Sequence, residues 1–411
     1  MLDVFPLHAP NPYFAARDGE LLIAGRKISD IVASGGRTPL YVYDRSIMTR
    51  NMQELRAVLP DALHLHYAIK ANPLLPVVEH FRGLVDGFDV ASVGELEVAL
   101  RAAMPADRIS FAGPGKAPAE LERAVEAGIV LNVESELELA RVTEIAVRRR
   151  QRARVAIRVN PDFELKSSGM KMAGGPKPFG VDAERVPALL ARIATLPVEF
   201  WGFHIFSGSQ NLRPEALVES QQKTAALAIE LARSAPAPVR LLNLGGGFGI
   251  PYFPGERPLD LDPIARNLAG VVPELRDALP EAELCLELGR YLVGEAGVYV
   301  CEVVDKKVSR GHEFLITNGG LLHHLAASGN FGQVIRKNYP VLVANRVGTG
   351  KTRNVSVVGP LCTPLDLLAD RVDLPEADVG DWIAVFQSGA YGMTASPRGF
   401  LSHPEPAELC L

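Results

Sequence analysis

Short apolar runs alternate with longer stretches of helical period between about residues 63 and 289. This alternation is typical of repeated strand and helix units. Helical patterns occur, for example, over residues 93–103, 117–127, 136–150 and 214–234. Eight apolar runs are predicted to be strands, at residues 63–69, 87–90, 109–113, 130–133, 153–159, 199–206, 241–244 and 283–288.

Eight parallel strands with helical crossovers, spread over roughly 225 residues, match the size of a closed (β/α)8 barrel of the TIM type. An open, doubly wound sheet is the alternative, but it would concentrate polar residues near one switch point. Here polar or glycine-rich clusters follow the first, second, sixth, seventh and eighth strands. Because barrels place active sites at the carboxyl ends of their strands, we predict an α/β fold with a barrel.

The pattern changes after residue 290 to β-rich runs interrupted by glycine and proline, such as 297–308 and 381–387. These runs predict a second domain built as an antiparallel sheet or sandwich. The early strand at 38–44 lies outside the eight barrel strands, so we expect the N-terminal segment to pair with this sheet. The predicted division is an N-terminal segment over 1–45, a barrel over 46–289 and a C-terminal β-sandwich over 290–411.

Composition narrows the class of protein. The 411 residues are 47% hydrophobic and 22% charged, which suits a barrel with a substantial core and a smaller domain. A formal net charge of -5 offers no electrostatic case for nucleic acid, and no apolar run approaches the roughly 18 residues that cross a membrane. The first residues lack a basic and then apolar secretory signal, so we expect a cytoplasmic protein.

The four cysteines, at positions 285, 301, 362 and 410, have no metal-ligand spacing. They are also too few for a disulfide scaffold in a chain of this length. We therefore expect reduced thiols and predict no metal site.

Lys70 ends the first barrel strand, in the run His66-Tyr67-Ala68-Ile69-Lys70-Ala71-Asn72. A lysine in this position either extends to solvent or has a partner, because a charged amine is seldom fully buried. A desolvated lysine amine can act as a Schiff-base nucleophile. Lys70 alone does not decide between these interpretations.

Candidate binding residues follow the strands that would close the barrel. Gly245, Gly246 and Gly247 come after the seventh strand, and adjacent glycines let backbone N–H groups converge on an anion. A tight turn is the alternative. Glu287 and Arg290 end the eighth strand; they form either an ordinary ion pair or a site in which the arginine binds a planar anion.

Two residues at the end of the sixth strand complete this group. His204 is either a hydrogen-bonded core residue or a ring that stacks on a flat ligand. Ser207 offers a hydroxyl group to a phosphate.

Nine motifs together resemble the pyridoxal-phosphate decarboxylases of alanine racemase-like fold, especially the diaminopimelate and ornithine decarboxylases. In chain order and with the family's spacing, they are TPLYVYD, HYAIKAN, GFDVASVGE, RVNP, HIFSGSQ, GGGFGIPY, ELGRYLVGEAG, GPLCTPLD and SGAYGM. The resemblance implies pyridoxal 5'-phosphate as cofactor and a homodimer with shared active sites.

The resemblance also implies roles for individual residues. Lys70 would hold the cofactor as a Schiff base, and Glu287 would keep the pyridine nitrogen protonated, which favours decarboxylation over racemisation. Cys362 would come from the partner subunit and return a proton to the carbanion; without the motif it would be read as a small buried hydrophobe. The other cofactor-binding residues implied are Asp89, Arg158, His204, Ser207, Gly245, Gly246, Gly247, Arg290 and Tyr391.

The sequence departs from the family where substrate is bound. Thr363 follows the cysteine, where diaminopimelate decarboxylases have glutamate and ornithine decarboxylases aspartate. Ala326 and Asn330 stand at the places of the arginine and tyrosine that hold the distal carboxylate of diaminopimelate. Loss of such charged partners costs enough recognition to change the substrate. The substrate-binding candidates are Arg290, Thr363, Asp366 and Tyr391.

We therefore predict a pyridoxal-phosphate-dependent decarboxylase that acts at the Cα of an amino acid other than free diaminopimelate, with a group tethered to an acyl carrier protein as one candidate. A genuine diaminopimelate decarboxylase remains an alternative. So does a racemase, which would need a second base opposite Lys70. A non-catalytic cofactor carrier or regulatory homologue is the third alternative. Such carriers can consist of a barrel alone, so the second domain with Cys362 and Tyr391 argues against it.

Overall fold

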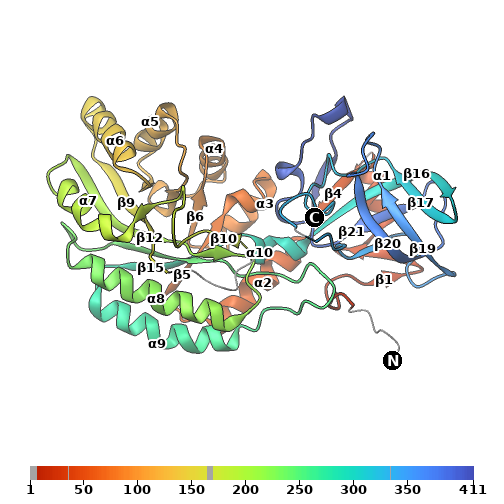
Figure 1. Ribbon diagram of the computed structural model, residues 1–411, viewed down its shortest axis with the longest axis horizontal. Coiled ribbons are helices and arrows are strands. Elements are labelled where there is room, and N and C mark those ends of the chain that lie inside the picture. The colour runs from red at the N-terminus through yellow and green to blue at the C-terminus, as the bar shows by residue number, and fades with distance from the viewer. Residues whose placement is uncertain (1–6, 36, 164–169, 334) are drawn as a thin grey trace. The chain divides into compact units, whose positions relative to one another are not determined.

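The computed structural model describes residues 7–35, 37–163, 170–333 and 335–411. It divides into two compact units. The barrel unit comprises Asn51–Ile250 and Leu259–Tyr291, and the β-rich unit comprises the segments up to Arg50, Pro251–Pro258 and Leu292–Leu411. Figure 1 shows the course of the chain through both. No helix among the described residues is long and apolar enough to cross a membrane.

The barrel unit is a closed ring of eight parallel strands, as the sequence predicts. The ring closes because β8 pairs with β9, and the full order around it is β9, β12, β14, β15, β5, β6, β7 and β8. The strands are β5 (Leu63–Ala68), β6 (Gly87–Val90), β7 (Ile109–Phe111), β8 (Val130–Val133), β9 (Ala153–Asn160), β12 (Val198–Ile205), β14 (Leu241–Gly246) and β15 (Glu283–Leu288). A short strand, β11 (Val181–Asp182), pairs parallel with the carboxyl end of β9.

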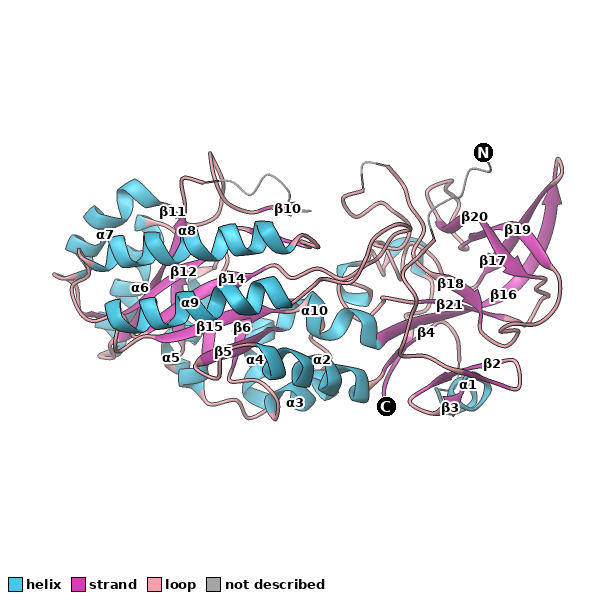
Figure 2. Ribbon diagram, turned by 90° about the horizontal axis from the view of Figure 1, so that it is seen from below, coloured by secondary structure: helices cyan, strands magenta, loops and turns pink. Residues whose placement is uncertain are grey.

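Helices cover the outside of the ring, and α8 and α9 run side by side along it (Figures 1 and 2). Two helices begin at serines that cap them: Ser92 Oγ accepts from Glu95 N at 3.2 Å, and Ser135 Oγ accepts from Glu138 N at 3.1 Å. The helices are α2 (Arg45–Val58), α3 (Leu75–Arg82), α4 (Val93–Arg101), α5 (Pro118–Ala127), α6 (Glu136–Arg149), α7 (Val186–Ile193), α8 (Pro214–Ala232) and α9 (Asp262–Ala278). A short helix, α10 (Arg290–Val293), follows β15.

Among the described residues, the β-rich unit contains a large mixed sheet whose longest strand is β16 (Gly297–Ser309) and a small antiparallel sheet of β1 (Ala16–Arg17), β2 (Glu20–Ile23) and β3 (Arg26–Lys27). The predicted pairing of the N-terminal segment is confirmed: β4 (Leu40–Tyr43) lies antiparallel to β16, with Leu40 opposite Val300. Most neighbouring strands are antiparallel, but β17 pairs parallel to β19, and β22 parallel to β4. The other strands of this sheet are β17 (His312–Thr317), β18 (Val341–Val343), β19 (Thr352–Val358), β20 (Leu367–Pro375), β21 (Trp382–Val385) and β22 (Ala407–Cys410).

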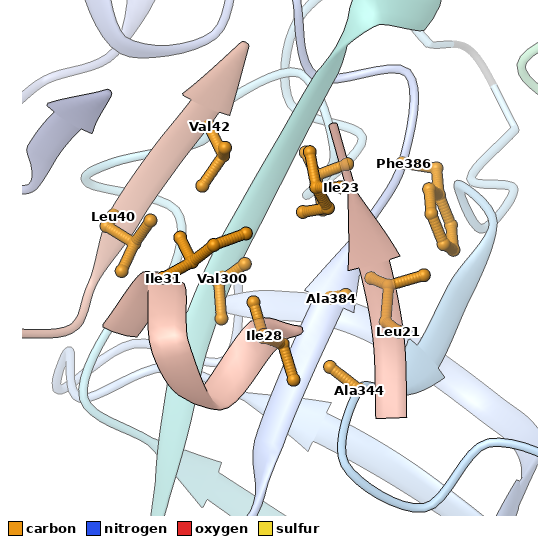
Figure 3. Packing of buried hydrophobic residues seen from close by; sticks show 11 residues of the cluster. Leu21, Ile23, Ile28, Ile31, Leu40, Val42, Val300, Ala344, Ala384 and Phe386 are labelled. Carbon is orange, nitrogen blue, oxygen red and sulfur yellow. The ribbon is translucent and has the colours of Figure 1, made fainter. Parts of the chain in front are cut away.

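A hydrophobic core joins the N-terminal segment to this sheet (Figure 3). Leu21 and Ile23 from β2 (Glu20–Ile23) and Ile31 from α1 (Ile28–Gly35) pack with Val300 and Phe386. All are buried, and burying an aliphatic side chain of this size contributes about 1.5–3 kcal/mol. The described residues from β2 to β4 therefore belong to the β-rich unit, because their apolar side chains complete its core.

Candidate active site

Three predicted residues meet where the barrel strands end. Lys70 lies in the short turn after β5, and Glu287 lies on β15, the neighbouring strand. The Lys70 Nζ atom is 2.8 Å from Glu287 Oε1, and the His204 Nε2 atom is 3.1 Å from Glu287 Oε2. The lysine side chain is 43% exposed, whereas that of Glu287 is 4% exposed. The amine is therefore both accessible and paired with a buried carboxylate.

The charge of Glu287 is maintained by its two neighbours. Burial by itself would raise the pKa of this carboxyl group, but the charge of Lys70 and the hydrogen bonds from His204 and Lys70 hold the pKa well below its usual range. Glu287 is consequently a carboxylate at neutral pH. A buried carboxylate of this kind can keep a proton on the ring nitrogen of a heterocycle that binds next to it.

The glycine loop, Gly245–Gly247 at the carboxyl end of β14, is packed too closely for any side chain. A Cβ atom on Gly245 would lie 2.7 Å from Ile205 O, and one on Gly246 would overlap the backbone oxygen of Glu287. Gly245 and Gly247 also have φ values of +72° and +81°, which favour glycine. The loop backbone therefore lies directly against the ends of β12 and β15.

Ser207 lies beside this loop. Ser207 is buried, and its Oγ atom has no hydrogen-bond partner within the described part of the chain. Buried hydroxyl groups are normally hydrogen-bonded. The close glycine backbone and this hydroxyl group suit a phosphate, so these residues fit the anionic end of pyridoxal phosphate.

The remaining barrel candidates occupy different surroundings. Arg158, on β9, is buried and donates from Nη1 to Glu134 Oε1 at 3.1 Å. Asp89, on β6, lies inside the ring, hydrogen-bonded to Ser110 and 3.4 Å from His66 Nδ1. Arg290 begins α10 and is half-buried. Their roles toward a cofactor stay predictions.

Sequence reasoning missed two acidic residues in the barrel unit. Burial raises the pKa of Glu95, and the charges of Lys70 and Glu287 act on it in opposite directions. Glu134 accepts hydrogen bonds from Gly113 N at 2.5 Å and from Gly180 N at 3.0 Å, in addition to Arg158. Glu95 is the last residue of the motif GFDVASVGE, so the sequence could have indicated it as a site residue. No sequence pattern indicates the contacts of Glu134.

Cys362 lies on an exposed loop of the β-rich unit, between β19 and β20. Asp366 holds this loop: Oδ1 accepts from Leu321 N at 2.5 Å, and Oδ2 accepts from Leu361 N at 2.8 Å. Gly320 and Gly359 leave the space for its carboxylate, which a Cβ atom at either position would enter. Asp366 thus ties the backbone of the Cys362 loop, at Leu361, to the segment after β17, at Leu321. Its contact with substrate stays a prediction.

The three positions at which the sequence departs from the family, 326, 330 and 363, carry neutral side chains. Ala326 is buried, and Asn330 donates from Nδ2 to Ser328 Oγ at 2.8 Å and to Leu365 O at 3.2 Å. Thr363 is half-buried, and its Oγ1 accepts from Leu365 N at 3.3 Å. Ala326 therefore packs inside the unit, and the side chains of Asn330 and Thr363 are hydrogen-bonded to neighbouring residues of the same unit.

Two hydrogen bonds join this segment to the turn that carries Tyr391. The His324 Nε2 atom is 2.9 Å from Ser388 Oγ, and Leu325 N donates to Ser396 Oγ at 2.9 Å. Burial lowers the pKa of His324 to about 3, so the imidazole is neutral. Tyr391 itself is half-buried, with a φ of +53°. Sequence reasoning missed His324, whose buried surroundings have no local sequence signature.

The sequence matches a protein-family model, that of the pyridoxal binding domain of pyridoxal-dependent decarboxylases, over residues 45–294. The chain is 39% identical over 378 residues to an L-glutamyl-[BtrI acyl-carrier protein] decarboxylase of Niallia circulans, covering 90% of this chain and 88% of that protein. It is 34% identical over 404 residues to a diaminopimelate decarboxylase of Aquifex aeolicus, covering 97% and 92%.

The fold is similar to that of a diaminopimelate decarboxylase from M. jannaschii crystallised with L-lysine. The TM-score is 0.86 and the sequence identity 26%, with 98% of this chain and 93% of that chain covered. These matches, together with the barrel and the β-rich unit, define a pyridoxal-phosphate-dependent decarboxylase. The chain belongs to the pyridoxal-dependent decarboxylase family, and the expected cofactor and reaction class are confirmed.

Proposed function

We propose that this enzyme removes the α-carboxylate from an amino acid whose far end is joined to an acyl carrier protein. The observation that carries the proposal is the neutral set Ala326, Asn330 and Thr363, at the places where diaminopimelate decarboxylases bind charge. The nearby cation Arg336 is engaged with Ser328 O at 3.1 Å and Leu367 O at 2.7 Å. The similarity to a carrier-linked glutamyl decarboxylase supports the same substrate class.

Each residue of the proposed site has a separate role in the reaction. Bound pyridoxal phosphate supplies the electron sink that accepts the bonding pair left when carbon dioxide departs. Lys70 holds the cofactor through its amine, and the glycine loop with Ser207 binds the phosphate. Glu287 keeps a proton on the ring nitrogen. Cys362 returns a proton to the substrate carbon after carbon dioxide leaves.

The test is an assay of carbon dioxide release from matched substrates. Glutamyl carrier protein, the same glutamyl group on free pantetheine, free glutamate, diaminopimelate, lysine, ornithine and arginine are compared at equal concentration. We expect kcat/KM for the carrier-linked group to exceed that for each free amino acid by about 10²-fold or more, as expected for mismatched polar ends. Lys70→Ala protein is the control for release without the site. Rapid turnover of free diaminopimelate would contradict the proposal.

We also propose a homodimer in which Cys362 serves the partner's barrel. Its loop borders an apolar surface on which Phe331 is 45%, Ile335 77% and Leu365 57% exposed. Exposed apolar side chains favour a protein contact, and the hydrogen bond from Asn330 to Leu365 O joins the Cys362 loop to the segment that carries Phe331. The partner proposed is a second copy of this chain, because the cysteine needs a barrel to serve.

Mixing two impaired variants tests the shared site. Lys70→Ala and Cys362→Ala proteins are dissociated, mixed and reassociated. A mixed dimer contains one site with both native residues, so we expect activity above that of either parent. Light scattering measures the molar mass of the native protein and so shows whether it is a dimer. A monomer, or a mixture no more active than its parents, would count against the shared site.

A further inference from the structure

Glu134 joins three segments at the carboxyl end of the barrel. It directly follows β8, and its side chain is 2% exposed. Oε1 accepts hydrogen bonds from Gly113 N at 2.5 Å and from Arg158 Nη1 at 3.1 Å, and Oε2 accepts from Gly180 N at 3.0 Å. The donors belong to the loop after β7, to β9 and to the residue before β11. A buried carboxylate with these three donors fixes the segments relative to one another.

The guanidinium group of Arg158 is held in two ways. Besides the hydrogen bond to Glu134, its Cζ atom lies over the ring of Phe179, 5.3 Å from the centroid. The chain after Phe179 approaches closely, because a Cβ atom on Gly180 would lie 2.9 Å from the backbone oxygen of Arg158. A guanidinium carries five N–H donors in one plane, and the bond to Glu134 uses one. Glu134 and Phe179 therefore orient a planar cation that can still donate to a ligand.

Arg158 lies beside the group of residues that meets at Lys70. In the parallel pairing of β9 with β12, Arg158 is directly opposite His204. Residues paired in this way point to the same side of a sheet. His204 is bonded to Glu287, which is bonded to Lys70. A row of polar groups thus runs along neighbouring strands inside the ring, from Glu134 through Arg158 to the Lys70 amine.

Resting on the cofactor site proposed above, we infer that Glu134 is a positioning residue of the active site, which orients Arg158 toward bound pyridoxal phosphate and balances its charge. β9 lies between β8 and β12 in the ring, so Arg158 has Glu134 on one side and His204 on the other. A carboxylate on the far side offsets the repulsion between the guanidinium and a second positive charge held at Lys70. Without Glu134, Arg158 would keep its charge but lose its orientation.

A double-mutant cycle tests whether Glu134 acts through Arg158. Glu134→Gln, Arg158→Gln and the double variant are freed of cofactor and titrated with pyridoxal phosphate, and visible absorbance gives the dissociation constant. We expect each single substitution to raise this constant about tenfold, the effect of one lost charge-assisted hydrogen bond. The double variant should stay within about threefold of Arg158→Gln, because Glu134 has nothing to position once the guanidinium is gone.

Glu138→Gln is the matched control. Glu138 is also buried, but its Oε1 accepts from Lys116 Nζ, and its Oε2 accepts from Glu134 N at 2.8 Å. The substitution removes a buried ion pair without removing the partner of Arg158. It should therefore lower the melting temperature of the cofactor-free protein at least as much as Glu134→Gln does. Its dissociation constant for pyridoxal phosphate should stay within about threefold of the native value, because loss of stability alone does not reorient Arg158.

The pH dependence of the visible absorbance tests the charge balance. Glu134→Gln leaves the charge of Arg158 unbalanced, which disfavours protonation of the nitrogen that joins Lys70 to the cofactor. The absorbance of this variant should therefore titrate at lower pH than that of the native protein. Glu134→Asp keeps the negative charge and should titrate as the native protein does. In the double variant the titration should return toward the native pH.

Independent effects would overturn the inference: the dissociation constant of the double variant would then rise about 100-fold, the product of the two single effects. Native affinity in Glu134→Gln, with only its melting temperature lowered, would also overturn it. If Glu134→Gln does not fold, Glu134→Asp takes its place in the cycle, because its shorter side chain weakens the same contact. Failure of the proposed cofactor site looks different, because Lys70→Ala protein would then keep the native absorbance with pyridoxal phosphate.

Discussion

Lys70 is distinguished from an ordinary strand-end lysine by the buried carboxylate 2.8 Å from its amine. The pairing keeps Glu287 charged and holds the amine at one place on the barrel rim. The sequence placed Lys70, Glu287 and His204 at strand ends, but the pairing of the last two depends on strands that are distant along the chain.

Replacing Lys70 tests the covalent role of its amine. Lys70→Ala should lower kcat by more than about 10³-fold, because no other amine replaces the nucleophile. It should also remove the visible absorbance of the covalently held cofactor, while circular dichroism stays unchanged. Lys223→Ala is a matched control, since Lys223 forms an exposed pair with Glu219. Covalent attachment that persists at another lysine would refute the assignment.

Replacing Cys362 tests the proton return. Cys362→Ala should slow product formation by about 10²-fold, the usual contribution of a positioned acid, and should increase faulty transamination of the cofactor. Its dissociation constant for pyridoxal phosphate should be unchanged. Mass spectrometry of the products measures the ratio of decarboxylation to transamination. Cys410→Ala is the control, because Cys410 lies in β22, where its Sγ accepts a hydrogen bond from Arg45 Nε. An unchanged ratio in Cys362→Ala would exclude the role.

At the scale of elements, the glycine loop depends on the close approach of three strands. β14 carries it, while the backbones of β12 and β15 fill the space where side chains would be. Three adjacent glycines indicated an anion site from the sequence. That they also leave room for the backbone oxygen of Glu287 could be seen only in the folded barrel.

Adding one methyl group tests this packing. Gly246→Ala places a Cβ atom on the backbone oxygen of Glu287, so the loop must shift and cofactor affinity should fall about tenfold or more, with lower stability. Gly270→Ala, inside α9, meets nothing within 4 Å and should be neutral or stabilise by about 0.4–1 kcal/mol. Thermal melting and cofactor titration measure both. Equal behaviour of the two variants would show that the loop tolerates a side chain.

At the scale of the molecule, the barrel interior contains a buried ion pair whose protonation is linked to stability. Burial alone would lower the pKa of His66, but the nearby carboxylates of Asp89 and Glu283 raise the pKa to about 9. Because the folded pKa lies above the ordinary value of about 6.5, the stabilisation is fully present below pH 6.5. It is lost as the pH rises through about 9.

The expected loss of unfolding free energy between these pH values is roughly 3 kcal/mol. His66→Gln cannot be protonated, so it should be less stable at pH 6 and should lack this component of the pH dependence. Chemical denaturation of both proteins at intervals from pH 6 to 10 measures the difference. Parallel curves for the two proteins would show that His66 is not protonated in the folded state.

The sequence by itself determined the eight barrel strands, the pairing of the N-terminal segment with a β-rich domain, the cofactor and the reaction class. These follow from local periodicity and from motifs contiguous in the chain. The tertiary structure alone decided that Pro251–Pro258 belong to the β-rich unit, that Asp366 holds the Cys362 loop, and that Glu287 is bonded to both Lys70 and His204. The physical reason is that burial and hydrogen-bond partners arise between strands and loops far apart in sequence, where no local pattern records which side chains meet.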